Sequence, residues 1–202
     1  NDMGSLIFPY AGADRMPLLG GWVHMLREFY GITAGVHGGK TNSCYPGLQA
    51  GMEKAQSILF PVLCGASGIG TIGQVEFGIT YSPLQLVLDA EIVRATKRIL
   101  QGFEVSEKTL CLDLIDKVGP EGNFITEAHT ADNFRREFWL SGLTQCVGWE
   151  TYTAGQRKGM EDSAAERARD IMARPLEPVL SDEQIAEIDR IVDHAEKKIS
   201  SE

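Results

Sequence analysis

The chain has 202 residues, a length that fits one domain, and its 28 acidic and 19 basic residues give a formal net charge of −9. Nucleic acids bind to basic surfaces, so this charge argues against a nucleic-acid partner. The longest apolar run, Ile58 to Cys64, is too short to span a membrane and contains Pro61.

Apolar residues at helical spacing predict a helix from Met16 to Tyr30, and Gly31 is suited to end it because glycine readily adopts positive φ. The apolar run from Ile32 to Val36 predicts the first strand. A polar loop follows, from Gly38 to Gly51, with the sequence GGKTNSCYPGLQAG. A strand, a polar loop and then a helix are typical of an α/β unit, in which functional side chains gather at the carboxyl end of the strand.

The helix after this loop is predicted to begin at Pro46 and to end near Leu59, because Pro61 should interrupt it. Small apolar residues from Ala66 to Ile72 predict a second buried strand. The loop that follows, Gly73 to Tyr81, carries a second group of polar and aromatic side chains.

The next helix has the clearest signals, since Ser82 is a favourable N-cap, Pro83 suits the first turn and Gly102 ends the pattern. Beyond it the alternation of strands and helices fades. We predict helices at residues 107–118, 130–139, 159–174 and 181–199, and a short strand within residues 123–129.

Residues 1–102 therefore give the order helix, strand, helix, strand, helix. That order fits about three-eighths of a (β/α)8 barrel, or part of an open, doubly wound sheet. Two strands are too few for either fold, because the edges of so short a parallel sheet would be unpaired.

Three sequence blocks follow one another in order and carry a resemblance to a known family. They are GGKTNSCYPGLQAGMEKA (38–55), LCGASGIGTIGQVEFGITYSPLQLVLDAEI (63–92) and LQGFEVSEKTLCLDLIDKVGPEGNFITEAHT (100–130). The succession resembles the trimethylamine methyltransferase family, whose members are corrinoid-protein methyltransferases that act on methylated amines. Family members are single (β/α)8 barrels, and this chain resembles their C-terminal part. The resemblance implies α/β structure, with the C-terminal part of a TIM barrel at residues 1–102 and barrel closure plus a helical C-terminal extension at residues 103–202.

The resemblance also implies a reaction and a partner. The expected enzyme moves a methyl group from trimethylamine, or from a quaternary amine such as a betaine, to the Co(I) of a partner corrinoid protein. Cobalamin is carried by that partner, no cofactor is expected to bind this chain directly, and a homo-oligomer is expected. Some family members carry pyrrolysine near the position of Cys44, so this chain resembles the branch without pyrrolysine, several of whose members use betaine-like amines.

Two other interpretations stay open. The chain resembles only part of the family's length, so one alternative is a truncated, non-catalytic remnant or an assembly subunit of such an enzyme. The other is a (β/α)8 enzyme with unrelated chemistry, because a fold does not fix a function.

The candidate site residues lie in the loops after the two predicted strands. Cys44 and Glu76 are the predicted catalytic residues, with the Glu76 carboxylate facing a methylated cation. The predicted substrate-binding residues are His37, Asn42, Ser43, Gln74, Phe77 and Tyr81. The structural alternatives are a solvent-exposed Glu76, a loop-filling Cys44, core packing for Phe77, a structural His37, and helix capping by Asn42 and Ser43.

The four cysteines are far apart in sequence and form no C-x-x-C pair, so no metal site is predicted and reduced thiols in a cytoplasmic protein are expected. Outside the candidate loops we expect Cys64, Cys111 and Cys146 to be small buried side chains. We interpret His129, at the end of the third block, as structural.

Overall fold

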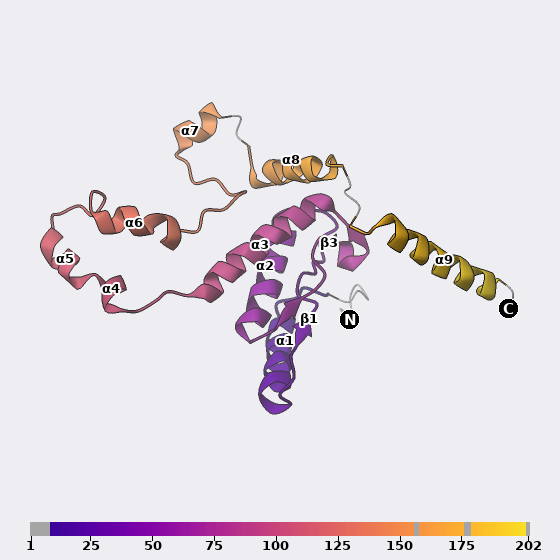
Figure 1. The fold of residues 1–202 in the computed structure, drawn as a ribbon. Helices are drawn as coiled ribbons and strands as arrows, with labels where there is room; N and C mark the ends of the chain where they lie inside the picture. Colours follow the sequence, from indigo (N-terminus) through magenta and orange to yellow (C-terminus); the bar gives the residue numbers. More distant parts are fainter. Residues whose placement is uncertain (1–8, 156–157, 176–178, 201–202) are drawn as a thin grey trace. The chain divides into compact units, whose positions relative to one another are not determined.

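The computed structural model describes residues 9–155, 158–175 and 179–200. The chain divides into two compact units, one ending at Arg169 and the other beginning at Asp170. The first unit contains both candidate loops, and the second contains the last helix (Figure 1). Within the described residues, no helix combines the length and the apolar composition that a membrane span requires.

The first described helix, α1 (Arg15–His24), continues as a π-helical segment, η1 (Met25–Phe29). Together they confirm the predicted helix from Met16 to Tyr30, and Gly31 follows with a φ of +65°. Val23 on α1 is fully buried and forms a small apolar core with Ala34 and Val36.

Two short parallel strands and the helix between them form the centre of the first unit. Strand β1 (Gly35–Val36) pairs with β2 (Gly68–Ile69), with Gly35 opposite Gly68 and Val36 opposite Ile69. Helix α2 (Leu48–Leu63) connects them. The predicted strand, loop and helix are thus present, although each strand is shorter than the sequence predicts.

The predicted end of α2 near Leu59 is wrong, because the helix runs through Pro61 to Leu63. A proline cannot donate to the carbonyl four residues before it, which here is that of Ser57. Gly38 packs against this carbonyl so closely that a Cβ at Gly38 would lie 2.4 Å from the Ser57 oxygen. Pro61 itself is buried, so packing within the unit offsets the missing helical hydrogen bond.

The loop predicted from Gly73 to Tyr81 contains an antiparallel hairpin. Strand β3 (Gln74–Val75) pairs with β4 (Thr80–Tyr81), and a short 3-10 turn, η2 (Glu76–Gly78), joins them. Each strand has only two residues, which is too short for an alternating pattern to appear in the sequence.

Helix α3 (Pro83–Gln101) has the ends that the sequence predicts. The Ser82 side chain accepts a hydrogen bond from the backbone N–H of Gln85, Pro83 occupies the first turn, and Gly102 follows with a φ of +59°. Helix α3 packs against α2, which packs against α1 (Figure 1). This stack supports the candidate loops from one side.

The remaining elements are helical. They are α4 (Glu107–Leu110), α5 (Leu112–Val118), α6 (Ala128–Glu137), α7 (Trp149–Ala154), α8 (Met160–Met172) and α9 (Asp182–Ile199). The helix predicted at residues 107–118 is broken at Cys111, whose φ is +51°. The strand predicted within 123–129 is wrong: these residues form a turn, closed by a hydrogen bond from Glu127 N to Phe124 O, that leads into α6.

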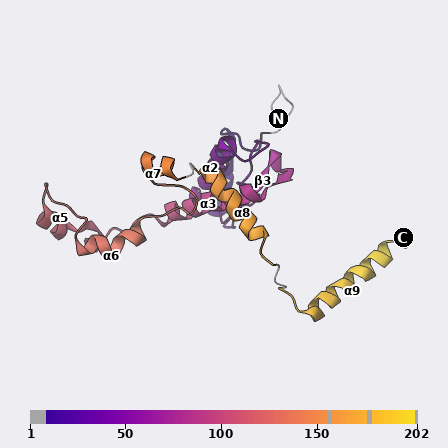
Figure 2. The ribbon, with the colours of Figure 1, turned by 90° about the horizontal axis from the view of Figure 1, so that it is seen from above.

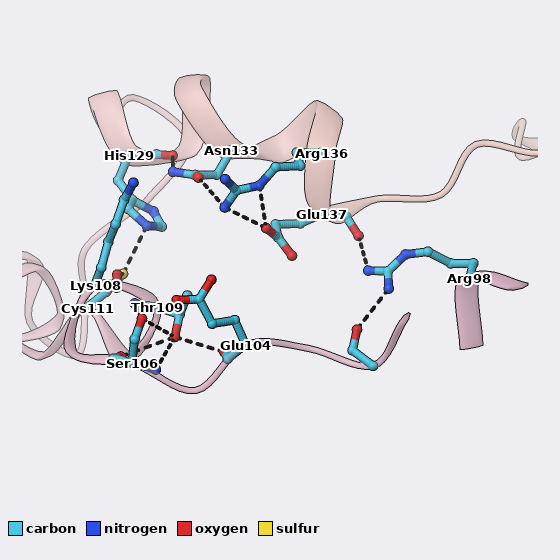
Figure 3. Close-up of polar contacts among 11 residues, drawn as sticks. Arg98, Glu104, Ser106, Lys108, Thr109, Cys111, His129, Asn133, Arg136 and Glu137 are labelled. Atoms are coloured by element: carbon cyan, nitrogen blue, oxygen red, sulfur yellow. Dashed lines mark hydrogen bonds and ion pairs between the residues drawn. The ribbon is translucent and has the colours of Figure 1, made fainter. Parts of the chain in front are cut away.

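Helix α3 also anchors the chain that follows it. Figures 1 and 2 both show α8 next to α3, where Ala164 of α8 packs with Leu88 and Leu143. The buried Glu91 carboxylate accepts hydrogen bonds from Ser141 Oγ (2.6 Å) and Gly142 N (2.9 Å). At the other end of α3, Arg98 donates to the carbonyl oxygens of Gly102 and Glu137, which ties α3 to the end of α6 (Figure 3).

The described part of the chain is therefore a helix-rich mixture of α and β structure, which confirms the coarse fold class. Its two parallel strands do not by themselves establish a barrel. The predicted division at residues 102 and 103 stays a prediction.

Candidate functional site

Helix α2 holds the polar loop after β1 through one buried carboxylate. Glu53 accepts hydrogen bonds from Thr41 Oγ1 (2.5 Å), Asn42 N (2.7 Å) and Gln49 Nε2 (3.0 Å). Burial acts to raise the pKa of Glu53, but the hydrogen bonds from Thr41, Gln49 and Asn42 outweigh it, so the pKa lies below its ordinary value. The loop is thus fixed to the helix by a carboxylate that stays ionised.

A buried ion pair joins this loop to the loop after β2. Lys54 Nζ on α2 lies 2.6 Å from Asp89 Oδ2 on α3, and neither side chain has any exposed surface. Lys54 also donates to the carbonyl of Gly39 (2.7 Å), and Asp89 accepts from the backbone N–H of Gly73 (2.6 Å). Burial lowers the pKa of Lys54 against the opposing attraction of Asp89.

The two candidate loops also contact each other directly through their backbones. Glu76 N donates to Ser43 O (2.7 Å), and Phe77 N donates to Thr41 O (3.1 Å). Cys44 follows Ser43 in the chain, so the backbones that carry the two predicted catalytic residues lie side by side. Both loops follow strands of one parallel pair, as the sequence predicts.

Three non-glycine residues between β2 and β4 lie in the left-handed region, one just before the second loop and two within it. Thr71, Glu76 and Phe77 have φ values of +67°, +52° and +58°. Such a conformation destabilises each residue by roughly 1–3 kcal/mol and persists only where the surroundings enforce it. Here the hydrogen bonds to Ser43 and Thr41 enforce it at Glu76 and Phe77. Strain of this kind gathers at functional sites, and it marks this loop as a candidate.

The hairpin side chains form two polar contacts. The half-buried Glu76 carboxylate accepts from Thr80 Oγ1 (2.6 Å), and Gln74 Nε2 donates to Tyr81 Oη (2.6 Å). The Tyr81 ring is exposed, and that of Phe77 is half-buried. This arrangement brings a carboxylate and two aromatic rings onto one short hairpin, which is a combination that attracts organic cations.

The residues of the first loop differ in how free they are to meet a ligand. Cys44 is exposed, whereas Ser43 is buried and donates from Oγ to Tyr45 O (2.8 Å). The Asn42 side chain bonds to Glu53 and accepts from the backbone N–H of Tyr10 (2.8 Å). The contacts of Asn42 and Ser43 hold the loop, and their substrate-binding role stays a prediction.

His37 lies at the start of the first loop and near Gly70, which follows β2. It is exposed and directly follows β1, and a Cβ at Gly70 would lie 3.6 Å from its Nδ1. Nearby, Lys40 Nζ sits 3.9 Å from the centre of the Tyr10 ring, a cation–π contact. In the described part of the chain, no three His, Cys, Asp or Glu side chains gather into a group that could hold a metal ion.

The buried residues on α2 and α3 that hold the two loops were not among the residues predicted from the sequence. Glu53, Lys54 and Asp89 lie on helices, where charged residues are usually solvated, and all three are buried. One signal was available for Lys54, which lies four residues after Ala50 and four before Ile58 and so shares a helix face with apolar residues.

Comparison with known proteins identifies a family that matches this chain. A family model described as trimethylamine methyltransferase (MTTB) matches residues 11–200. The trimethylamine methyltransferase MttB1 of Methanosarcina acetivorans is 31% identical over 188 residues, which cover 92% of this chain and 37% of that protein.

Two relatives from Desulfitobacterium hafniense carry different names. One, named trimethylamine methyltransferase MttB, is 30% identical over 195 residues, covering 96% of this chain and 39% of that protein. The other, named glycine betaine methyltransferase, is 28% identical over 178 residues, covering 88% of this chain and 37% of that protein. The chain therefore spans under two-fifths of the length of these relatives.

Proposed function

Since this chain belongs to the trimethylamine methyltransferase family, we propose that it takes part in moving a methyl group from a methylated amine to the Co(I) of a partner corrinoid protein. The donor is trimethylamine or a quaternary amine such as a betaine. Relatives named for both kinds of donor support this range. When bound nearby, the partner's corrinoid would supply the acceptor for the methyl group.

The fold proposed for this function is part of a (β/α)8 barrel. The order β1, α2, β2, α3 and the parallel pairing of β1 with β2 support it. In such barrels the reaction takes place at the carboxyl ends of the strands, where the two candidate loops of this chain lie.

The hydrogen bond from Glu76 N to Ser43 O carries the proposal for the site. It joins the loop of Cys44 to the hairpin of Glu76, so both predicted catalytic residues belong to one structure. The Glu76 carboxylate would attract the positive charge of the amine, and the rings of Phe77 and Tyr81 would contact its methyl groups. These residues would hold one C–N bond in line for transfer, which is a task of positioning. Cys44, exposed beside them, would contact the donor.

One observation favours a second candidate, an assembly subunit that works only with further protein. Large apolar side chains are exposed along the start of α2, including Leu48 at 90% and Met52 at 56%. Soluble proteins usually cover such surfaces with other protein. Under this alternative the chain supplies scaffold and partner surface, and the reaction requires a larger assembly.

Both candidates are tested by mixing the purified chain with reduced corrinoid protein and either trimethylamine or glycine betaine. If absorbance shows that methylcobalamin forms, the result supports the proposal that the chain is an enzyme. Binding to the corrinoid protein without methylation by either amine supports the assembly subunit.

If methylation is observed, Glu76→Gln should lower the rate at least about tenfold, since losing 1.4 kcal/mol of transition-state stabilisation has that effect. Glutamine keeps the size of the side chain and an acceptor for Thr80 while removing the charge. Glu183→Gln on α9 is the matched control and should leave the rate unchanged. Equal rates for both variants would rule out a role for the Glu76 charge.

A further inference from the structure

A cysteine and a histidine meet away from the candidate loops. Cys111 Sγ, at the junction of α4 and α5, lies 3.0 Å from His129 Nε2 in the first turn of α6 (Figure 3). Cys111 is half-buried, so the expectation of a small buried side chain is wrong for it. It is also wrong for Cys64, which is half-buried, and for Cys146, which is exposed.

Both members of the pair are held by hydrogen bonds in their own elements. Asn133 Nδ2 donates to the carbonyl of His129 (2.7 Å), and Thr130 Oγ1 donates to the carbonyl of Phe124 (2.7 Å). On the other side, a reciprocal capping box between Ser106 and Thr109 fixes α4. The contact therefore joins two segments whose backbones are held by hydrogen bonds.

Small molecules have access to the sulfur. Cys111 and His129 both line a cavity of about 600 Å³ between α4, α5 and the start of α6. His129 also lines a neighbouring cavity of about 260 Å³, together with Thr109 and Asn133. The imidazole thus borders both cavities, and the thiol borders the larger one.

The sulfur has two polar neighbours, and each has a role. The carbonyl oxygen of Lys108 lies 2.9 Å from Sγ and accepts a hydrogen bond from the thiol. His129 Nε2 lies at a comparable distance on the other side. A histidine within hydrogen-bond reach of a thiol is the usual arrangement for activating it as a nucleophile.

We propose that Cys111 is a modification site at which a small hydroperoxide oxidises the thiol to a sulfenic acid, with His129 as the base. The sulfur attacks one oxygen of the O–O bond, an S–O bond forms as the O–O bond breaks, and His129 Nε2 takes the thiol proton. That proton then passes to the departing oxygen, which leaves as water or an alcohol. The cysteine is oxidised and the peroxide is reduced, so atoms and electrons balance.

The chain contains its own comparison sites. Cys44 and Cys146 are more exposed than Cys111. Among the described residues, neither has a hydrogen bond to a histidine side chain. If accessibility alone set the rate of oxidation, these two cysteines would react before Cys111.

The test treats the purified chain with hydrogen peroxide and dimedone, which traps sulfenic acids, and measures the adduct at each cysteine by peptide mass spectrometry. Because general-base assistance by His129 accelerates attack by the thiol, Cys111 should be labelled at least about tenfold faster than Cys44 or Cys146. After unfolding in urea, the three cysteines should react at similar rates. Labelling of native Cys111 no faster than that of Cys146 overturns the proposal.

A variant separates the base from the local environment. His129→Gln should reduce labelling of Cys111 to the rate of Cys146, whereas His24→Gln, at the exposed end of α1, should leave it unchanged. If Cys111 in a folded His129→Gln chain keeps its rate, the proposal fails. Should that variant not fold, the comparison of native with unfolded wild type decides alone, because a loss of rate on unfolding requires a folded partner.

Discussion

Glu53 links the stability of the chain to the geometry of the candidate site. Its carboxylate accepts from Thr41 and Asn42, which form the turn leading to Cys44. The same turn supplies the carbonyl oxygens that accept hydrogen bonds from the backbone N–H groups of Glu76 and Phe77. An ionised side chain on a helix thus sets the position of two loops that it does not belong to.

This contact predicts a dependence of stability on acid. The pKa of Glu53 in the folded chain is below its ordinary value of 4.5. At a pH between the folded pKa and 4.5, the unfolded chain therefore binds a proton at Glu53 that the folded chain does not bind. The contribution of Glu53 is therefore fully present above pH 4.5 and is lost as the pH falls through the folded pKa. The pKa of Glu91 is lowered too: burial raises it, but hydrogen bonds from Ser141, Arg94 and Gly142 prevail.

The measurement is the free energy of unfolding in urea as a function of pH. Glu53→Gln should be about 2 kcal/mol less stable at neutral pH, because a hydrogen bond to a charged acceptor contributes about that much. Below pH 4.5 its stability should fall less steeply than that of the wild type. The exposed Gln56→Ala on the same helix is the control. Parallel curves for wild type and Glu53→Gln would contradict the assignment.

The buried Lys54–Asp89 ion pair joins helix α2 to helix α3. Removing one partner leaves the other charge buried and unpaired. Lys54→Met should therefore lower the free energy of unfolding by about 3–5 kcal/mol, whereas removing both charges should lower it less. The double variant Lys54→Met with Asp89→Leu recovers only part of the loss, because Gly39 O and Gly73 N lose their partners as well.

A double-mutant cycle in urea measures this coupling. If the two single losses simply add in the double variant, then the pair does not join the helices as described. Leu86→Ala, on the exposed face of α3, controls for a general effect of truncation.

The elements themselves show what sequence can predict. Helix ends governed by neighbouring residues agree with the sequence predictions, such as the Ser82 cap of α3 and the helix predicted at residues 181–199, which begins with a Ser181–Gln184 capping box. Errors arose where contacts distant in sequence decide. Pro61 stays helical because it is buried in the packed unit.

The candidate site shows the same division. Its loops were located from the strand and helix pattern, because that pattern is local. The hairpin and the buried carboxylates behind it could not be predicted, since they depend on which helices pack together. The left-handed residues Glu76 and Phe77 are fixed by backbone bonds to a loop more than thirty residues earlier, and nothing in their own neighbourhood signals that conformation.

At the scale of the whole molecule, the exposed apolar side chains at the start of α2 indicate a surface for further protein. A second copy of the chain is one occupant, in line with the homo-oligomer expected from the sequence. Because Leu48 and Met52 are exposed in the single chain, their replacement should leave its own stability nearly unchanged, within about 0.5 kcal/mol. Their effect should appear in association instead.

Sedimentation velocity over a range of concentrations tests this separation. The wild-type chain should form larger species as its concentration rises, and the variant Leu48→Gln with Met52→Gln should remain a monomer to higher concentration, because less apolar surface is removed from water on association. Gln56→Ser on the same helix should behave like the wild type. A chain that stays monomeric at all concentrations would contradict self-association through this surface. A variant that unfolds more easily by over about 1 kcal/mol would show that these side chains stabilise the single chain.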